Sequence, residues 1–141
     1  MLVPVIVRVN VKVEDDTTLV LEDVVETNLP LLFPEVSVFN RNASSANVTV
    51  LLERVTVWAD QSDNDFDGTA TKVIVSSFSL GANSSSLLSL STDSLTGESY
   101  GQTNELTLTN AGPADEVLVS VVIKGMIETS ITPDPNVVVN G

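Results

Sequence analysis

The residue types best suited to site chemistry lie in one acidic stretch, DQSDNDFDG, from Asp60 to Gly68. It holds four of the chain's 19 acidic residues within nine positions. Alternate carboxylates ahead of a sharp glycine turn can wrap a calcium ion, which takes about six to eight hard oxygen ligands. The segment DNDFDG over 63–68 matches the opening D-x-[DN]-x-[DN]-G of the calcium-loop pattern. The stretch therefore predicts either a calcium site or a solvated turn.

In the calcium interpretation, Asp63, Asp65 and Asp67 supply side-chain oxygens and Thr69 supplies a backbone carbonyl. The resemblance to EF-hand-like loops ends early, because the twelfth position falls on Ile74, where a bidentate Glu is expected. A β-hairpin loop could recruit the first acid of the stretch or a remote one instead. In the alternative, Asp, Asn and Gly are simply residues that tolerate turn geometry. Calcium is the one candidate cofactor.

Catalytic chemistry is largely excluded by residue types. The chain has no His and no Cys, which removes Ser-His-Asp and Cys-His catalysis and the usual zinc sites. No phosphate-binding glycine loop occurs. Two-carboxylate glycoside hydrolysis stays open, but sugar clefts usually present several aromatic platforms, and here only Trp58 and Tyr100 are amphipathic aromatics. We therefore expect a protein that is not an enzyme.

Charge and hydropathy restrict the partners. The formal net charge is −13, with only six Lys and Arg, so no basic patch of the size that nucleic acids or anionic membranes require is expected. No apolar run approaches the roughly 18 residues of a membrane-spanning helix. The N-terminal MLVPVIVRVNVKV alternates from its start, which predicts a strand and not a signal peptide.

The spacing of apolar residues predicts an all-β fold. Odd positions of 3–13 are all Val, opposite Ile6, Arg8, Asn10 and Lys12, as in a long half-buried strand. Turn signals recur roughly every 8–15 residues, and no segment keeps a helical period. We expect one domain over 1–141, an antiparallel β-sandwich of about seven to nine strands, either immunoglobulin-like or jelly-roll-like.

Three hairpins are expected between neighbouring segments. The first strand pairs with 17–25, strand 47–59 pairs with 69–80 with the acidic stretch at the tip, and 104–110 pairs with 116–128. A bend is expected near Glu53-Arg54. The two prolines in ETNLPLLFPE predict a crossing between sheets or an edge position. The segment 92–103 has little periodicity and is expected to form a long exposed loop.

Three stretches resemble immunoglobulin-like modules of bacterial and viral surface proteins. They are VSVFNRNASSANVTVLLERVTVWAD, FSLGANSSSLLSL and LTLTNAGPADEVLVSVVI, which fall within about the last hundred residues. The shared features are turns and core positions and not site residues, so the resemblance implies a fold and carries little about function.

The composition is typical of an extracellular protein, being rich in Thr, Ser and Asn and poor in Lys, yet no export signal is expected. A virion protein released by lysis reconciles these features. The chain resembles the decoration or cement proteins that bind the outer capsid surface of tailed bacteriophages, often as trimers. That resemblance implies a homo-oligomer that clamps neighbouring capsid subunits through sheet edges and extended arms, here 1–13 and 129–141. The alternative is a calcium-stabilised extracellular or cell-surface adhesion module.

Overall fold

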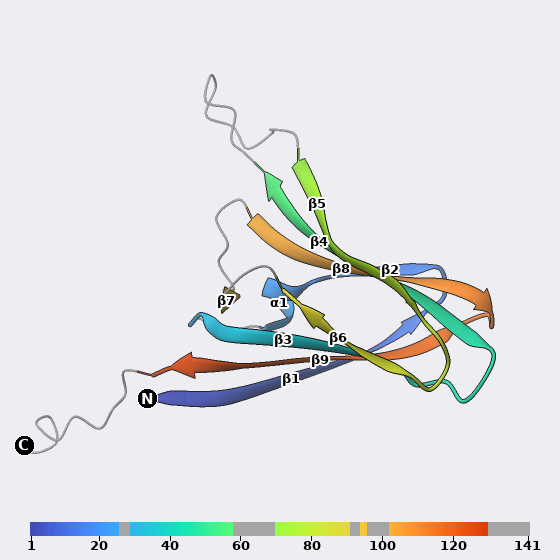
Figure 1. Cartoon of the computed structure of the whole chain (residues 1–141), viewed down its shortest axis with the longest axis horizontal. Helices are drawn as coiled ribbons and strands as arrows, with labels where there is room; N and C mark the ends of the chain where they lie inside the picture. Colours follow the sequence, from blue (N-terminus) through green and yellow to red (C-terminus); the bar gives the residue numbers. More distant parts are fainter. Residues whose placement is uncertain (26–28, 58–69, 91–93, 96–101, 130–141) are drawn as a thin grey trace, which may run out of the picture.

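The computed structural model describes residues 1–25, 29–57, 70–90, 94–95 and 102–129, which form two antiparallel sheets packed face to face (Figure 1). The described strands are β1 (Leu2–Val13), β2 (Asp16–Val20), β3 (Leu31–Asn40), β4 (Ala46–Val57), β5 (Ala70–Leu80), β6 (Ser85–Ser89), β7 (Ser94–Leu95), β8 (Gln102–Pro113) and β9 (Val117–Glu128). Sheet A has the order β1-β9-β3-β6, with β7 also paired to β3, and sheet B has the order β2-β8-β4-β5. The predicted antiparallel β-sandwich is confirmed.

The strand order is that of a jelly roll. Successive strands alternate between the sheets, except that β4 and β5 share sheet B and β6 and β7 share sheet A. The terminal strand β9 returns beside β1, and β8 returns beside β2, which makes two interlocked Greek keys. In the immunoglobulin arrangement the first two strands share a sheet. Of the two expected architectures, the jelly roll is therefore the one that the strand order matches.

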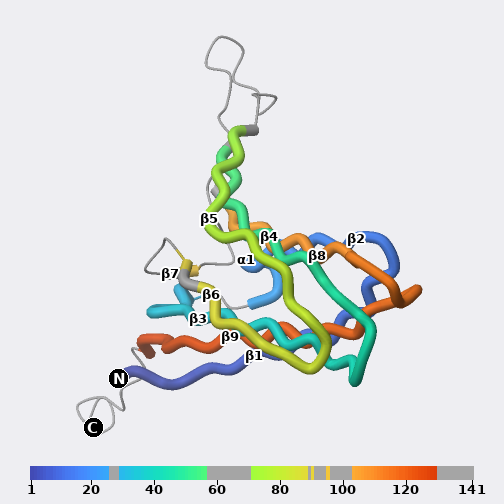
Figure 2. The backbone as a smooth tube through the Cα atoms, turned by 45° about the vertical axis from the view of Figure 1, so that its right-hand side comes forward, coloured from blue at the N-terminus to red at the C-terminus, as the bar shows by residue number. Residues whose placement is uncertain are grey.

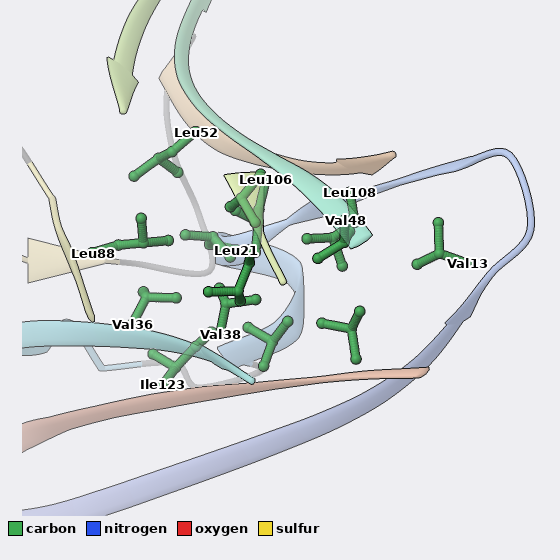
Figure 3. Close-up of a cluster of buried hydrophobic side chains, with 14 of the residues drawn as sticks. Val13, Leu21, Val36, Val38, Val48, Leu52, Leu88, Leu106, Leu108 and Ile123 are labelled. Atoms are coloured by element: carbon green, nitrogen blue, oxygen red, sulfur yellow. The ribbon is translucent and has the colours of Figure 1, made fainter. Parts of the chain in front are cut away.

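The core consists of aliphatic side chains from both sheets (Figure 3). The alternation of β1 turns Val5, Val7, Val11 and Val13 towards this core and leaves the even-numbered residues exposed, as the sequence predicts. Side chains from sheet A meet those from sheet B across the gap between the ribbons. The fully buried members include Leu31, Val36, Val38 and Ile123 from sheet A, and Val48, Val50, Leu52, Leu106 and Leu108 from sheet B.

The prediction of a strand over 17–25 is wrong for its second half, where the helix α1 (Leu21–Val25) forms. Leu21 and Val25, four residues apart on one helix face, are buried in the core. Glu22 is also buried, and its carboxylate accepts hydrogen bonds from the backbone N (2.8 Å) and the side-chain Nδ2 (2.6 Å) of Asn104. The burial of Leu21 and Val25 and the two hydrogen bonds of Glu22 favour a helical turn over continued extension. Among the described residues, no helix has the length and apolarity to cross a membrane.

Two of the three predicted hairpins are wrong. β1 pairs with β9 and β2 with β8, so the turns after β1 and after β8 are corners at which the chain changes sheets. Asn110 joins these two corners: its backbone N donates to Asp15 O (2.8 Å), and its Nδ2 donates to Glu14 O (3.1 Å) and Ala114 O (2.9 Å). A turn-forming sequence does not reveal whether the chain folds back in the same sheet or passes to the opposite one.

The third predicted hairpin is confirmed. β4 and β5 pair antiparallel from Val48 opposite Leu80 to Val57 opposite Ala70, and the register shifts next to Glu53, where a bend was expected. The far ends of these two strands twist around each other and extend past the rest of sheet B (Figure 2). The acidic stretch connects them and lies outside the described residues.

Part of the predicted 92–103 loop is a core element. Leu95 in β7 is fully buried and pairs with Leu31 of β3.

The expected crossing near the two prolines is confirmed, since the chain passes from β2 in sheet B through α1 to β3 in sheet A. Pro34 nevertheless sits inside an interior strand. The register of β3 against β9 shifts between Leu32 and Glu35, and this bulge accommodates the proline.

The two expected arms differ in what the structure describes. Residues 2–13 form β1, which pairs with β9 along its whole length, so they complete sheet A. Met1 and Thr129 are also joined, because the Thr129 backbone N donates to Met1 O (3.0 Å) and the N-terminal ammonium is paired with Glu128. The arm over 130–141 lies outside the described residues and stays a prediction.

Candidate interaction surface

The residues predicted to bind calcium, Asp63, Asp65, Asp67 and Thr69, lie outside the described residues. The predicted site therefore stays a prediction. Ile74, at the position where an EF-hand would have its glutamate, is an exposed residue of β5. Within the described ranges, no group of three or more acidic side chains comes together in a way that could hold a metal ion.

The strongest candidate for a functional surface is the outer face of sheet A, which points away from the core. It is built by alternate residues of adjacent strands: Arg8 lies opposite Val122, and Val122 lies opposite Ser37. Since the inward positions of these strands are core valines and isoleucine, the intervening side chains must point outward. The face comprises Leu2, Pro4, Ile6, Arg8, Asn10 and Lys12 of β1, Leu118, Ser120, Val122, Lys124 and Met126 of β9, Phe33, Glu35, Ser37 and Phe39 of β3, Arg41 just after it, and Leu87 of β6.

Large apolar side chains are exposed on this face. Ile6, Phe33 and Leu87 are 64%, 66% and 61% exposed, and Leu2 and Leu118 are also open to solvent. On the described part of sheet B, the large exposed apolar residues are Val73 and Ile74, both near the end of β5. Single exposed apolar residues are ordinary, but several on one sheet face indicate a surface that another molecule covers.

Most of the cations also lie on this face. Arg8, Lys12, Arg41 and Lys124 are four of the six Lys and Arg residues of the whole chain. Lys124 lies opposite Glu35 in register, and Lys12 forms a weak surface pair with Glu116 at 3.7 Å. The residues of this outer face therefore carry four positive charges and one negative charge, on a molecule of net charge −13. An acidic partner would meet the least repulsion here.

A polar network orders the middle of the face. Ser120, nearly fully buried, donates from Oγ to Asn10 Oδ1 (2.7 Å) and accepts a hydrogen bond from Arg41 Nε (3.0 Å). The Arg41 guanidinium also lies over the Phe39 ring, 5.1 Å from its centroid, and its backbone N donates to Leu118 O (2.8 Å). Three strand segments are tied together by these contacts, which fix the position of Arg41.

Two hollows indent the face. The larger, about 490 Å³, is lined by cations and polar groups around Arg41 and Ser120. The smaller, about 330 Å³, is mainly apolar and is lined by residues that include Pro4, Ile6, Phe33 and Met126. Both lie along β1 and β9, so one ligand could contact a charged and an apolar hollow together.

Phe33 is held in an unusual conformation at the apolar hollow. Its φ is 53°, in the left-handed region that bulky residues rarely adopt, and its side chain is largely exposed. The exposed ring contributes little hydrophobic stabilisation to the fold, and its backbone conformation is strained. A contact with another molecule therefore explains this residue better than a role in folding. Gly125 lies beneath it on β9, where a Cβ would come within 2.5 Å of Leu31 Cγ.

The open edge of β1 adjoins the same face. β1 is the last strand of sheet A on its side, and within the described residues its second edge has no strand partner. Such an edge presents unpaired backbone donors and acceptors to an incoming strand. Pro4 removes one donor near the start, which leaves most of the strand able to pair.

Sequence reasoning placed the candidate metal site in the acidic stretch and named 1–13 as a contact arm, but it did not predict this sheet face. One signal was present: Ile6, Arg8, Asn10 and Lys12 stand opposite the valine series in β1. Their assembly with Arg41, Ser120 and Lys124 required the pairing of β1 with β9, at opposite ends of the chain. Strand order is not readable from local pattern.

Comparison with known proteins assigns this chain neither a family nor a function. No family model matches the chain, and no curated protein matches it. One solved structure with a similar arrangement is described as the crystal structure of PirA; it shares 10% sequence identity, covers 86% of this chain and 90% of its own, and has a TM-score of 0.37. At this level of similarity we draw no functional conclusion from it.

Proposed function

We propose that this chain is a non-enzymatic structural protein of a virus particle, which binds the outer surface of the capsid and clamps neighbouring capsid subunits. The observation that carries the proposal is the outer face of sheet A, where exposed apolar side chains, most of the cations and an open strand edge lie together. Jelly rolls are found in viral capsid proteins, and also in lectins and cupins, so the fold is compatible with the role without assigning it.

The proposed binding mode combines two contacts. Ile6, Phe33 and Leu118 are buried against the capsid, which supplies hydrophobic stabilisation, while the cations of the face attract acidic groups of the partner. The open edge of β1 accepts a strand from a capsid subunit, which adds main-chain hydrogen bonds. The chain acts as a homo-oligomer, with a trimer as the expected state, so that several such contacts act together.

Co-sedimentation tests the proposal. The purified chain is mixed with capsids of the bacteriophage or prophage whose genome encodes it, and the particles are separated on a density gradient. We expect saturable binding at a fixed ratio of chain to capsid subunit, and an oligomer in sizing of the free chain. A folded monomer that remains at the top of the gradient at every concentration would overturn the proposal.

A further inference from the structure

The larger hollow on the outer face of sheet A brings together three cations, whose side chains can only donate hydrogen bonds. Arg8, Lys12 and Arg41 line it, and Asn10 lies between Arg8 and Lys12 on β1. The hollow measures about 490 Å³, and Val11, Leu118 and Val119 form its apolar part. Three cations around one hollow are notable because the rest of the chain is strongly acidic.

The hydrogen-bond network determines which atoms face the hollow. Ser120 Oγ donates to Asn10 Oδ1, which uses one lone pair of that oxygen and leaves the Nδ2 donors of Asn10 for a ligand. Arg41 uses Nε for Ser120, which leaves its two terminal nitrogens for a ligand. Within the described residues, neither these nitrogens nor the Arg8 guanidinium has a hydrogen-bond or ion-pair partner. The free side-chain groups at the hollow are thus mainly donors, as an anion requires.

Arg41 is prepared for binding before a ligand arrives. Its Nε bond and its position over the Phe39 ring hold the guanidinium plane, so little side-chain freedom is lost when an anion binds. A fixed guanidinium matches the two oxygens of a carboxylate in a bidentate arrangement. Lys12, at the rim, is already within 3.7 Å of the Glu116 carboxylate of the same chain, which would compete with an incoming one.

We propose that this hollow binds a carboxylate. This deepens the proposed function, on which it rests for the source of the group: an Asp or Glu side chain of the capsid subunit enters between Arg8 and Arg41. The neighbouring apolar hollow takes an apolar residue of the same segment. The hollows extend from Lys12 to Pro4 along β1, a distance of roughly 27 Å, which corresponds to about eight residues of an extended partner segment.

Nuclear magnetic resonance titration of the intact chain at low salt tests the proposal. The probe is acetyl-glutamate amide, the control is its neutral analogue acetyl-glutamine amide, and inorganic phosphate is a third arm. We expect the backbone amide signals of Asn10, Arg41 and Ser120 to shift with the glutamate probe alone, with a dissociation constant on the order of millimolar. Equal shifts with the neutral analogue, or tighter binding of phosphate at the same residues, would overturn the carboxylate assignment.

Two lysines provide a matched comparison. Lys12 and Lys72 are similarly exposed (59% and 52%), and each has one surface carboxylate partner, at 3.7 Å and 3.8 Å, but Lys72 lies in sheet B. Lys12→Gln should weaken binding of the glutamate probe about threefold, and Lys72→Gln, with the same change in net charge, should leave it unchanged. Equal effects of the two substitutions would show that the glutamate probe responds only to the net charge of the molecule. That result would contradict binding of the probe in the hollow.

Glu116→Gln removes the competing carboxylate and should tighten binding of the probe about twofold. Unchanged or weaker binding would show that Glu116 does not compete with the probe.

The titration and the co-sedimentation test different claims, so either can fail without the other. Co-sedimentation without a response to the glutamate probe removes the hollow and keeps the capsid role. A response to the probe without co-sedimentation removes the capsid role and keeps the carboxylate site.

Discussion

The two outer faces of this jelly roll are built on the same plan and carry different side chains. The described part of sheet B exposes hydroxyl and charged groups, and its large exposed apolar residues are Val73 and Ile74 near one end of β5. Thr18 and Thr107 share a hydroxyl hydrogen bond of 3.0 Å, and Lys72 pairs with Glu105 at 3.8 Å. Sheet A exposes large apolar residues and cations, with two hollows and a left-handed Phe33. Folding requires only that the inner faces be apolar, so the outer faces are free to differ, and under the proposed function the difference identifies sheet A as the face that binds the capsid.

The largest expected effect concerns the backbone beneath the apolar hollow. Gly125→Ala should lower the free energy of unfolding by about 2–3 kcal/mol, because the new Cβ would lie 2.5 Å from Leu31 Cγ and 2.9 Å from the Leu32 carbonyl oxygen. Gly81→Ala, where the nearest atom would be Asn47 Oδ1 at 3.6 Å, is the matched control and should change stability by less than about 0.5 kcal/mol. Urea denaturation measures both. Equal costs would show that the glycine contact does not shape this face.

Phe33→Asn separates stability from binding. Asn tolerates the left-handed region better than Phe, and the ring is largely exposed, so the free energy of unfolding should rise by about 0.5–1 kcal/mol. Loss of the ring should weaken capsid binding about tenfold. Thermal melting and co-sedimentation measure the two effects. A destabilised variant that binds as well as the parent chain would mean that the ring serves the fold.

Ile6 and Ile74 provide the most direct comparison between the sheets. They are 64% and 63% exposed, each on an edge strand, Ile6 in sheet A and Ile74 in sheet B. Ile6→Thr should weaken capsid binding about threefold to fivefold through lost apolar burial, whereas Ile74→Thr should have no effect. Both retain a β-branched side chain, so stability should change little in either. A larger loss from Ile74→Thr would place the contact on sheet B.

The smallest effect is expected on sheet B. Thr18→Val removes the exposed hydroxyl bond to Thr107 and keeps the shape of the side chain. The free energy of unfolding should change by less than about 0.5 kcal/mol, and capsid binding should not change. A fall in binding measured by co-sedimentation would contradict the assignment of this face as the one left in solvent.

Local pattern predicted the elements of this fold better than their partners. The valine series of β1, the β4–β5 hairpin and the bend beside Glu53 were all readable, because each depends on residues close in the chain. The corners at Asp15 and Asn110 were not, since the same turn residues serve a hairpin and a change of sheet. Leu95 was predicted in a loop because a two-residue strand has no periodicity to detect.

The candidate surface could not be predicted from the sequence, for a related reason. The four strands that build this face come from distant parts of the chain. The hydrogen bond between Asn10 and Ser120, for example, spans 110 positions. Glu22, which lies outside this surface, shows the same limit. It was predicted in a strand, and its burial follows from a contact with Asn104 that no local pattern indicates. The acidic stretch drew attention because its residues are contiguous.

Hydrogen exchange of the free and the capsid-bound chain tests the central claim most directly. It reports in one experiment on β1, an edge strand of sheet A, and on β2 and β5, the edge strands of sheet B. We expect the amides of β1 and of the first half of β3, around Phe33, to gain protection in the bound state, while those of β2 and β5 exchange as in the free chain. Protection of β5 and β2 with β1 unchanged would contradict the account, because the capsid would then cover sheet B.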